Sequence, residues 1–256
     1  MMVSRIKKLI FYPRGMFMHK LPLHIDLNTI TVLKALNRAN NKIGELKGII
    51  NTLPNPELVL RLISLSESKD SAAIENIITT YDEIYKELVS KTPSGDKAKE
   101  IINYHNALKE GLALIKEKGF LSTNEIIKIH GIVEPNKQGI RKLPGTVIMN
   151  ELTKEIVHIP PQEEGKIRDL LHNLELYINT NDDYDPLIQM ALIHLQFESI
   201  HPFYDGNGRT GRIINILYLV LKNKLDAPLL YLSKYIIETK ANYYALLAKS
   251  QSNLAH

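Results

Sequence analysis

Hydrophobic residues recur at helical spacing along most of the chain. This spacing predicts an amphipathic helix that ends before Pro54, with its apolar face formed by Leu33, Leu36, Ile43, Leu46 and Ile50. A second helix follows over residues 58–66. A third apolar stripe, over about 70–89, predicts a separate helix that faces the core with Ile74, Ile77, Ile78, Tyr81, Ile84, Tyr85 and Leu88.

The second half of the chain shows clear helix boundaries. A helix over residues 101–115 closes at Gly119, and Ser122-x-x-Glu125 is a capping box that opens a short helix before Pro135. The pair Asp185-Pro186 supplies an N-cap and a proline in the first helical position. Further helical patterns cover residues 167–177, 211–224 and 239–249.

The hydrophobic residues depart from helical spacing in one region. There, two short β-prone runs over residues 146–149 and 156–159 flank the polar turn NELTKE. We therefore predict an all-α protein with one small β-hairpin. The segment KTPSGDK, residues 91–97, combines proline, glycine and serine and is the best linker candidate. It divides the chain into an N-terminal helical region, 1–95, and a core domain, 96–256.

Composition narrows the class of protein. The 256 residues are 44% hydrophobic and 23% charged, which is typical of a soluble globular chain, and the net charge of +4 is too small to argue for nucleic acid. Because cysteine is absent, disulfides, thiolate catalysis and cysteine zinc sites are excluded. No apolar run approaches the ~20 residues of a membrane span, and the N-terminus lacks a signal-peptide pattern, so we expect a cytoplasmic protein.

The stretch HPFYDGNGRTGR, residues 201–212, concentrates the candidate chemistry. Its Gly-x-Gly-x-x-Gly spacing is that of a dinucleotide-binding loop, but such a loop follows a parallel strand, whereas the residues before it have a helical pattern. A phosphate-binding Walker loop is excluded too, because no Lys-[Ser/Thr] follows the glycines. Neither glycine motif explains the stretch.

A third interpretation uses the helix that begins inside the stretch. Free N–H groups at a helix start form an anion site, and glycines at 206 and 208 let phosphate oxygens approach the backbone. Arg209 and Arg212, three residues apart, reach the same polyphosphate. The pattern indicates a nucleotide site.

Two further residues complete that interpretation. Asp205 is an oxygen ligand suited to Mg²⁺, and His201 is a candidate general base near neutral pH. The alternative is a hydrogen-bonded histidine at a helix end beside a solvated arginine face. That alternative suits any one of these residues better than it suits all of them within twelve positions.

The stretch also matches HPFx[D/E]GNGRxxR at every defined position, and on it the chain resembles the Fic family. Residues 139–161, GIRKLPGTVIMNELTKEIVHIPP, look like the hairpin "flap" of that family, and residues 230–247 resemble its following helices. The segment SAAIEN, residues 71–76, fits the inhibitory pattern [Ser/Thr]-x-x-x-Glu-[Gly/Asn]. The resemblance covers most of the chain.

The resemblance implies transfer of AMP from ATP to a hydroxyl of a target protein, with release of pyrophosphate. His201 would deprotonate a serine, threonine or tyrosine of the target, which includes the chain itself, and Asp205 would hold Mg²⁺. Phe203 would anchor the loop in the core, and the flap would align the target by strand addition. The implied ATP-binding residues are Glu75, Gly206, Asn207, Gly208, Arg209, Thr210, Gly211, Arg212, Tyr243 and Tyr244.

The resemblance also implies a brake formed by Ser71, Glu75 and Asn76. Glu75 paired with Arg212 would deny that arginine to the γ-phosphate of ATP. Ser71 lies at i−4 from Glu75, where its hydroxyl would steady the carboxylate.

Several alternatives stay open. A module that binds nucleotide without turnover would have no use for a base at His201, while removal of AMP would use the same site with Glu75 positioning water. The target, a strict need for ATP and homodimer formation are not written in the sequence. Longer relatives often continue into a winged-helix region, so any DNA-binding role of that region is not carried over.

Overall fold

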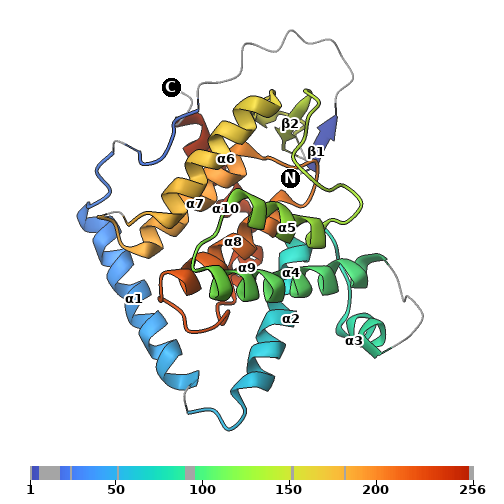
Figure 1. Ribbon diagram of the computed structural model, residues 1–256, viewed down its shortest axis with the longest axis vertical. Coiled ribbons are helices and arrows are strands. Elements are labelled where there is room, and N and C mark those ends of the chain that lie inside the picture. The colour runs from blue at the N-terminus through green and yellow to red at the C-terminus, as the bar shows by residue number, and fades with distance from the viewer. Residues whose placement is uncertain are drawn as a thin grey trace.

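The computed structural model describes residues 2–5, 18–23, 25–50, 52–89, 96–150, 153–181 and 183–253. Within those ranges helices dominate and one β-hairpin is present, as predicted (Figure 1). The strands are β1 (Met2–Arg5), β2 (Thr146–Met149) and β3 (Ile156–His158). The helices are α1 (Ile30–Ile50), α2 (Pro56–Ile74), α3 (Tyr81–Val89), α4 (Asp96–Lys118), α5 (Thr123–Val133), α6 (Glu164–Asn179), α7 (Pro186–Ile200), α8 (Asn207–Leu221), α9 (Leu232–Glu238) and α10 (Lys240–Asn253).

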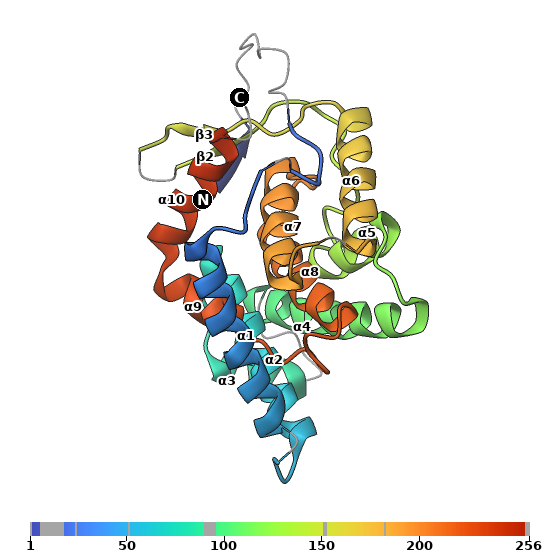
Figure 2. The ribbon, with the colours of Figure 1, turned by 90° about the vertical axis from the view of Figure 1, so that its left-hand side faces the viewer.

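Helix α8 is the centre of the core. It packs against α4, α5 and α7 (Figures 1 and 2), and nearly all of its residues are buried, including Arg209 and Arg212 in its polar first half. Its first turn is the second half of the stretch 201–212. The core therefore fixes the position of the candidate site directly.

The predicted helix boundaries in this half of the chain are confirmed. The Ser122–Glu125 capping box opens α5, Asp185 caps α7 through the Leu187 N–H, and Gly119 follows α4 with φ +72°. Of the predicted linker, residues 91–95 lie outside the described residues, and α4 begins at Asp96.

The prediction of one helix over about 70–89 is wrong. Helix α2 runs through to Ile74, and the chain breaks before α3 begins at Tyr81. Asn76 ends α2 in the left-handed region with φ +64°, and Thr80 and Glu83 bond each other's backbone N–H as a capping box that restarts the helix. The prediction that this apolar face packs into the core is wrong too, because four of its residues are exposed: Ile78, Tyr81, Tyr85 and Leu88.

The hairpin of β2 and β3 is present as predicted, and β1 adds a third strand that the sequence did not reveal. The sheet order is β1-β2-β3, with β1 antiparallel to β2 and Val3 opposite Ile148. The two strands of the hairpin flank a polar turn that marks them, whereas β1 has no such turn beside it and pairs with a segment more than 140 residues away. As a result, β2 is paired along both of its edges.

A buried carboxylate joins α2 to the core. Glu67 accepts hydrogen bonds from the Tyr104 hydroxyl (3.2 Å) and from the Ser233 hydroxyl (2.6 Å) and N–H (2.9 Å). Burial raises the pKa of Glu67, and the donors from Ser233 oppose that shift. The network links α2, α4 and α9, and so it positions the end of α2 over α8.

We expect Glu67→Ala to lower the free energy of unfolding by roughly 2–4 kcal/mol, because it leaves buried donors on α4 and α9 without an acceptor. Urea denaturation measures the change. The control is Glu57→Ala on the same helix, where the exposed pair with Arg61 contributes at most about 1 kcal/mol. Equal losses in the two variants would contradict the prediction.

Candidate active site

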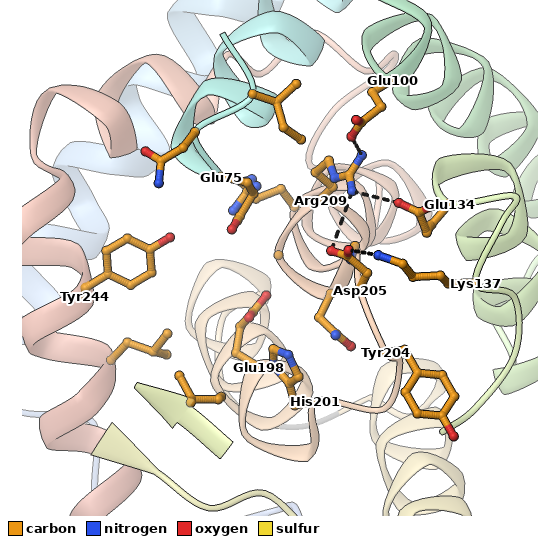
Figure 3. Close-up of a pocket in the computed structure, with 18 of the residues that line it drawn as sticks. Glu75, Glu100, Glu134, Lys137, Glu198, His201, Tyr204, Asp205, Arg209 and Tyr244 are labelled. Carbon is orange, nitrogen blue, oxygen red and sulfur yellow. Dashed lines mark hydrogen bonds and ion pairs between the residues drawn. The ribbon is translucent and has the colours of Figure 1, made fainter. Parts of the chain in front are cut away.

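A pocket of about 980 Å³ opens where the start of α8, the end of α2, the flap and α10 meet. It is lined by residues from all four, including Ile148 and Arg212, and by His201 at the end of α7. Figure 3 shows Glu75, His201 and Tyr244 on different sides of the pocket. The volume is within the usual range for a small-molecule site. Segments far apart in the sequence thus converge on the stretch 201–212.

His201 closes α7 in a left-handed conformation, with φ 47° and its N–H donating to the Phe197 carbonyl (3.0 Å). A non-glycine residue in this region is uncommon and needs support from its surroundings. Arg141, from the part of the flap that precedes β2, donates from Nε to the His201 carbonyl (2.8 Å) and from Nη2 to the Ile200 carbonyl (3.3 Å). These bonds fix the turn that brings the imidazole to the pocket.

The environment of His201 keeps its ring neutral. Burial, together with the charges of Arg141 and His158, lowers the pKa of His201 to about 3, while the nearby Glu198 carbonyl and Asp205 act in the opposite direction. At neutral pH the imidazole therefore has a free lone pair. It is competent to accept a proton.

The loop between α7 and α8 is locked from inside. Phe203 is fully buried and stacks on the His130 ring, with the ring centroids 3.6 Å apart. The Asn207 side chain accepts from the Phe203 N–H and donates to the Phe203 carbonyl, both at 2.9 Å. Phe203 is the predicted core anchor. The Asn207 side chain is committed to the loop, which leaves only its backbone to face a nucleotide.

Asp205 supplies the carboxylate of the stretch 201–212, and its side chain is 47% exposed. It pairs with the Lys137 ammonium, accepts from the Gly206 N–H (2.8 Å) and lies 3.9 Å from Arg209. Burial opposes its ionisation, but Lys137 and the Gly206 N–H lower the pKa of Asp205, so it is an anion at neutral pH. The described residues offer no cluster of three metal-ligating side chains. A lone carboxylate fits Mg²⁺, which takes its other ligands from phosphates and water.

The predicted contact between Glu75 and Arg212 is present. Arg212 Nη2 donates to a Glu75 carboxylate oxygen (3.0 Å), and a Cβ on Gly208 would lie 2.3 Å from that oxygen. Glu75 therefore lies against the first turn of α8, in the anion site of the helix N-terminus. Burial alone disfavours the charge of Arg212, but Glu75 raises its pKa, so the guanidinium stays charged.

The prediction that the Ser71 hydroxyl steadies the Glu75 carboxylate is wrong. The Ser71 hydroxyl accepts from Arg212 Nε (2.8 Å) and the Ser71 carbonyl accepts from Nη2 (2.9 Å), so the residue holds the arginine rather than the Glu75 carboxylate. The reason is geometric, since Glu75 has already left the helical path as the C-cap of α2. Asn76, which follows, lines the pocket and accepts from the Lys240 ammonium (3.0 Å).

The remaining predicted ATP-binding residues divide into two groups. Tyr243 and Tyr244 from α10 line the pocket, as do Gly206, Gly208 and Arg209. Thr210 and Gly211 do not line it, and we correct their assignment. They lie on the side of α8 that packs into the core, where a Cβ on Gly211 would be 2.5 Å from a carboxylate oxygen of Glu198. Gly211 gives room to that carboxylate and not to a phosphate.

Four charged residues that line the pocket from outside the flap were missed by the sequence analysis: Glu100, Glu134, Lys137 and Glu198. Figure 3 shows Glu198 beside His201 and the other three around Arg209 and Asp205. Glu198 lies three residues before His201, so its proximity could have been expected. The others come from α4 and from the segment after α5, and no local pattern connects them with the stretch 201–212.

A sequence model described as Fic/DOC family N-terminal matches residues 33–113, and a model of the Fic/DOC family matches residues 120–219. Together they cover most of the chain, including the stretch 201–212. The chain belongs to the Fic/DOC family. The Fic-type helical core predicted from the resemblance is thereby confirmed.

Its similarity to curated members is limited in extent. The chain is 28% identical over 126 residues to the protein adenylyltransferase Fic of Aedes aegypti, which is 46% of this chain and 24% of that protein. The Drosophila mojavensis protein of the same name is 29% identical over 125 residues, 46% of this chain and 23% of its own length. The match thus spans about a quarter of these relatives.

Solved Fic structures agree over a longer range. A Fic family protein from Desulfovibrio desulfuricans G20 superposes with a TM-score of 0.69 at 25% identity, over 88% of this chain and 69% of that one. Fic-1 from C. elegans superposes with a TM-score of 0.65 at 22% identity, over 89% and 67% of the two chains. The second similarity concerns the fold alone. No helix in the part of the chain that the structure describes is long and apolar enough to cross a membrane.

We expect Glu198→Gln to change how stability depends on pH. Burial raises the pKa of Glu198 to about 7, and this outweighs the opposing charge of Arg212. A raised folded-state pKa gives stability that is present below the unfolded pKa of about 4.5 and lost as pH rises through 7. The variant lacks that loss, so from pH 5 to 8.5 it should gain up to about 3 kcal/mol relative to wild type.

Urea unfolding of both proteins across this pH range is the measurement. The difference between the two curves isolates Glu198, because the buried histidines titrate alike in both. A difference that stays constant with pH would contradict the expectation.

Proposed function

We propose that this chain is a protein adenylyltransferase, which transfers AMP from ATP to a hydroxyl side chain of a target protein and releases pyrophosphate. One observation carries the proposal: a neutral buried imidazole and a cationic helix N-terminus open into the same pocket. Membership of the Fic/DOC family and the names of the curated relatives support it.

The residues supply what the reaction needs. In the proposed step the target oxygen attacks the α-phosphorus, the bond to the bridging oxygen breaks, and pyrophosphate leaves with that electron pair. The hydroxyl proton passes to His201, whose ring is neutral at pH 7 and has an unprotonated nitrogen to receive it. The N–H groups at the start of α8 and the guanidinium of Arg212 stabilise the negative charge of the phosphates.

Mg²⁺ fits the proposal through Asp205. When bound, the ion would neutralise phosphate charge and orient the nucleotide. In the present structure the Asp205 carboxylate is already balanced by Lys137 and, at 3.9 Å, by Arg209. A metal with a charge of +2 therefore competes with the ammonium of Lys137 for that carboxylate.

We further propose that Glu75 inhibits the reaction. Its carboxylate touches Gly208 and pairs with Arg212, so it uses the cation and the helix N-terminus that a phosphate would need. Arg212 is only 1% exposed, and it cannot turn towards solvent to find a second anion. A nucleotide that binds while Glu75 stays in place must adopt another pose.

The proposed partner is a protein segment that presents a serine, threonine or tyrosine beside the flap. Strand addition at β2 would require displacement of β1, since β2 is already paired with both β1 and β3. The outer edge of β3 is the other place for a strand. In either case the main-chain bonds of an added strand make few demands on the target sequence.

We expect His201→Ala to abolish transfer of label from α-labelled ATP to protein while nucleotide binding stays nearly intact, because the ring acts on the target hydroxyl. Label incorporation in a cell lysate with Mg²⁺ and calorimetric ATP binding are the measurements. His172→Ala, on the exposed face of α6, is the control and should behave as wild type. Loss of ATP binding as large as the loss of transfer would overturn the assignment. Binding without any transfer by wild type and by Glu75→Gly would identify a nucleotide-binding module.

We expect Glu75→Gly to raise label incorporation at least about tenfold, since restored positioning of a reacting group can be worth about a hundredfold. Adding Arg212→Ala should cancel the gain, because the released cation is then missing. Without nucleotide, Glu75→Gly should unfold at a lower temperature than wild type, because the Arg212 guanidinium, at 1% exposure, loses its carboxylate partner. Equal incorporation by wild type and Glu75→Gly over a range of ATP and Mg²⁺ concentrations would refute inhibition by Glu75.

A further inference from the structure

Arg209 is surrounded by carboxylates that come from three parts of the chain. Its Nη1 donates to Glu100 at 2.6 Å, its Nη2 donates to Glu134 at 3.3 Å, and Nη2 lies 3.9 Å from Asp205. Figure 3 shows the three acids on different sides of the guanidinium. The arginine side chain is only 3% exposed, so these contacts decide where it points.

Two of these contacts fix the plane of the guanidinium. A guanidinium is rigid and planar, so acceptors on both terminal nitrogens leave it little freedom to rotate. Its Nε has no hydrogen-bond partner among the described residues. Arg209 is therefore held by Glu100 and Glu134 at its two terminal nitrogens, while its Nε is shielded from solvent.

The supporting acids are themselves firmly placed. Glu134 is the C-cap of α5, where its N–H donates to the His130 carbonyl (2.8 Å), and its Cβ would lie 3.5 Å from a Cβ on Gly206. Glu100 lies in the second turn of α4, a helix that packs directly on α8. Glu75, in contrast, lies at a break between two helices. Carboxylates on packed helices are suited to hold a cation in place rather than to move away from it.

We propose that Glu100 and Glu134 are positioning residues, which orient the Arg209 guanidinium beside Asp205 before a nucleotide binds. This inference rests on the proposed function, because it assigns Arg209 to the phosphates of ATP. Glu100 acts through Arg209 and touches no reacting atom. Its side chain also connects α4 with the active-site turn of α8.

The test measures transfer and ATP binding separately in the whole chain. With Glu75→Gly as the parent, we expect Glu100→Ala to lower kcat about tenfold or more and to raise the KM for ATP, since misplacing a binding group by about 1 Å can cost up to about a hundredfold. Glu100→Gln keeps an acceptor for Nη1 and should recover part of the loss. Glu134→Ala should lower kcat in the same direction, but less, because its bond to Arg209 is longer.

The matched control is Glu110→Ala on the same helix, whose carboxylate pairs with Lys128 on the surface. It should leave both kcat and KM unchanged. Unchanged kinetics in Glu100→Ala would overturn the inference. So would tighter ATP binding with faster transfer, which would mean that Glu100 competes with the nucleotide for Arg209.

Two measurements keep the inference separate from the proposed function. If the parent transfers no AMP, calorimetric binding of ATP with Mg²⁺ still decides: weaker binding in Glu100→Ala than in Glu110→Ala supports the inference, and equal binding overturns it. If Glu100→Ala does not fold, Glu100→Gln takes its place, because it preserves the size of the side chain. Its ATP affinity should lie measurably below that of the control, and equality would overturn the inference.

Discussion

The buried guanidinium of Arg212 requires an anion, and the arrangement of the pocket follows from that requirement. A charge that is almost fully removed from water is costly unless it is paired and hydrogen-bonded. The end of α2 supplies the Ser71 hydroxyl, the Ser71 carbonyl and the Glu75 carboxylate. The cation on α8 therefore determines where α2 must end, and Gly208 leaves the space in which the carboxylate lies.

A second constraint is the conformation of the turn before α8. His201 lies in the left-handed region, which is uncommon for residues other than glycine, so the turn depends on its supports. Arg141 binds the carbonyls at the end of α7, and Asn207 binds both backbone groups of Phe203. These polar contacts are buried, so each of them is costly to lose. The imidazole is held by packing and backbone bonds rather than by a hydrogen bond to an acidic side chain.

The sequence was informative where the signal is local. The capping box at Ser122, the N-cap at Asp185 and the apolar runs of α8 predicted their helices because a helix boundary depends on a few adjacent residues. The same reasoning missed the break at Asn76, although Thr80 and Glu83 form a capping box of the kind recognised at Ser122. The apolar residues on both sides suggested one continuous helix. The regular spacing of apolar residues therefore concealed the helix boundary at Asn76.

The site was predictable to the extent that it is contained in residues 201–212. The ion pair between Glu75 and Arg212 was found because a second short motif marked Glu75. Glu100 and Glu134 lie 109 and 75 residues from Arg209, and nothing in their own neighbourhoods shows that they meet it. Such contacts depend on how α4, α5 and α8 pack, which no local pattern records.

Arg209 and Arg212 differ in how firmly their carboxylate partners are held by the rest of the structure. This difference bears on how the proposed reaction is controlled. The Glu75 carboxylate is attached to a chain break, so its departure requires only a local rearrangement between α2 and α3. Glu100 belongs to a packed helix and Glu134 caps one, so displacing them would disturb the core around α8. In the proposed reaction, a phosphate would therefore replace the anion on Arg212 at a lower cost in free energy than either anion on Arg209. Exchange of the Glu75 carboxylate for a phosphate at Arg212 would then be the controlled event, while Arg209 would provide a fixed reference for the rest of the nucleotide.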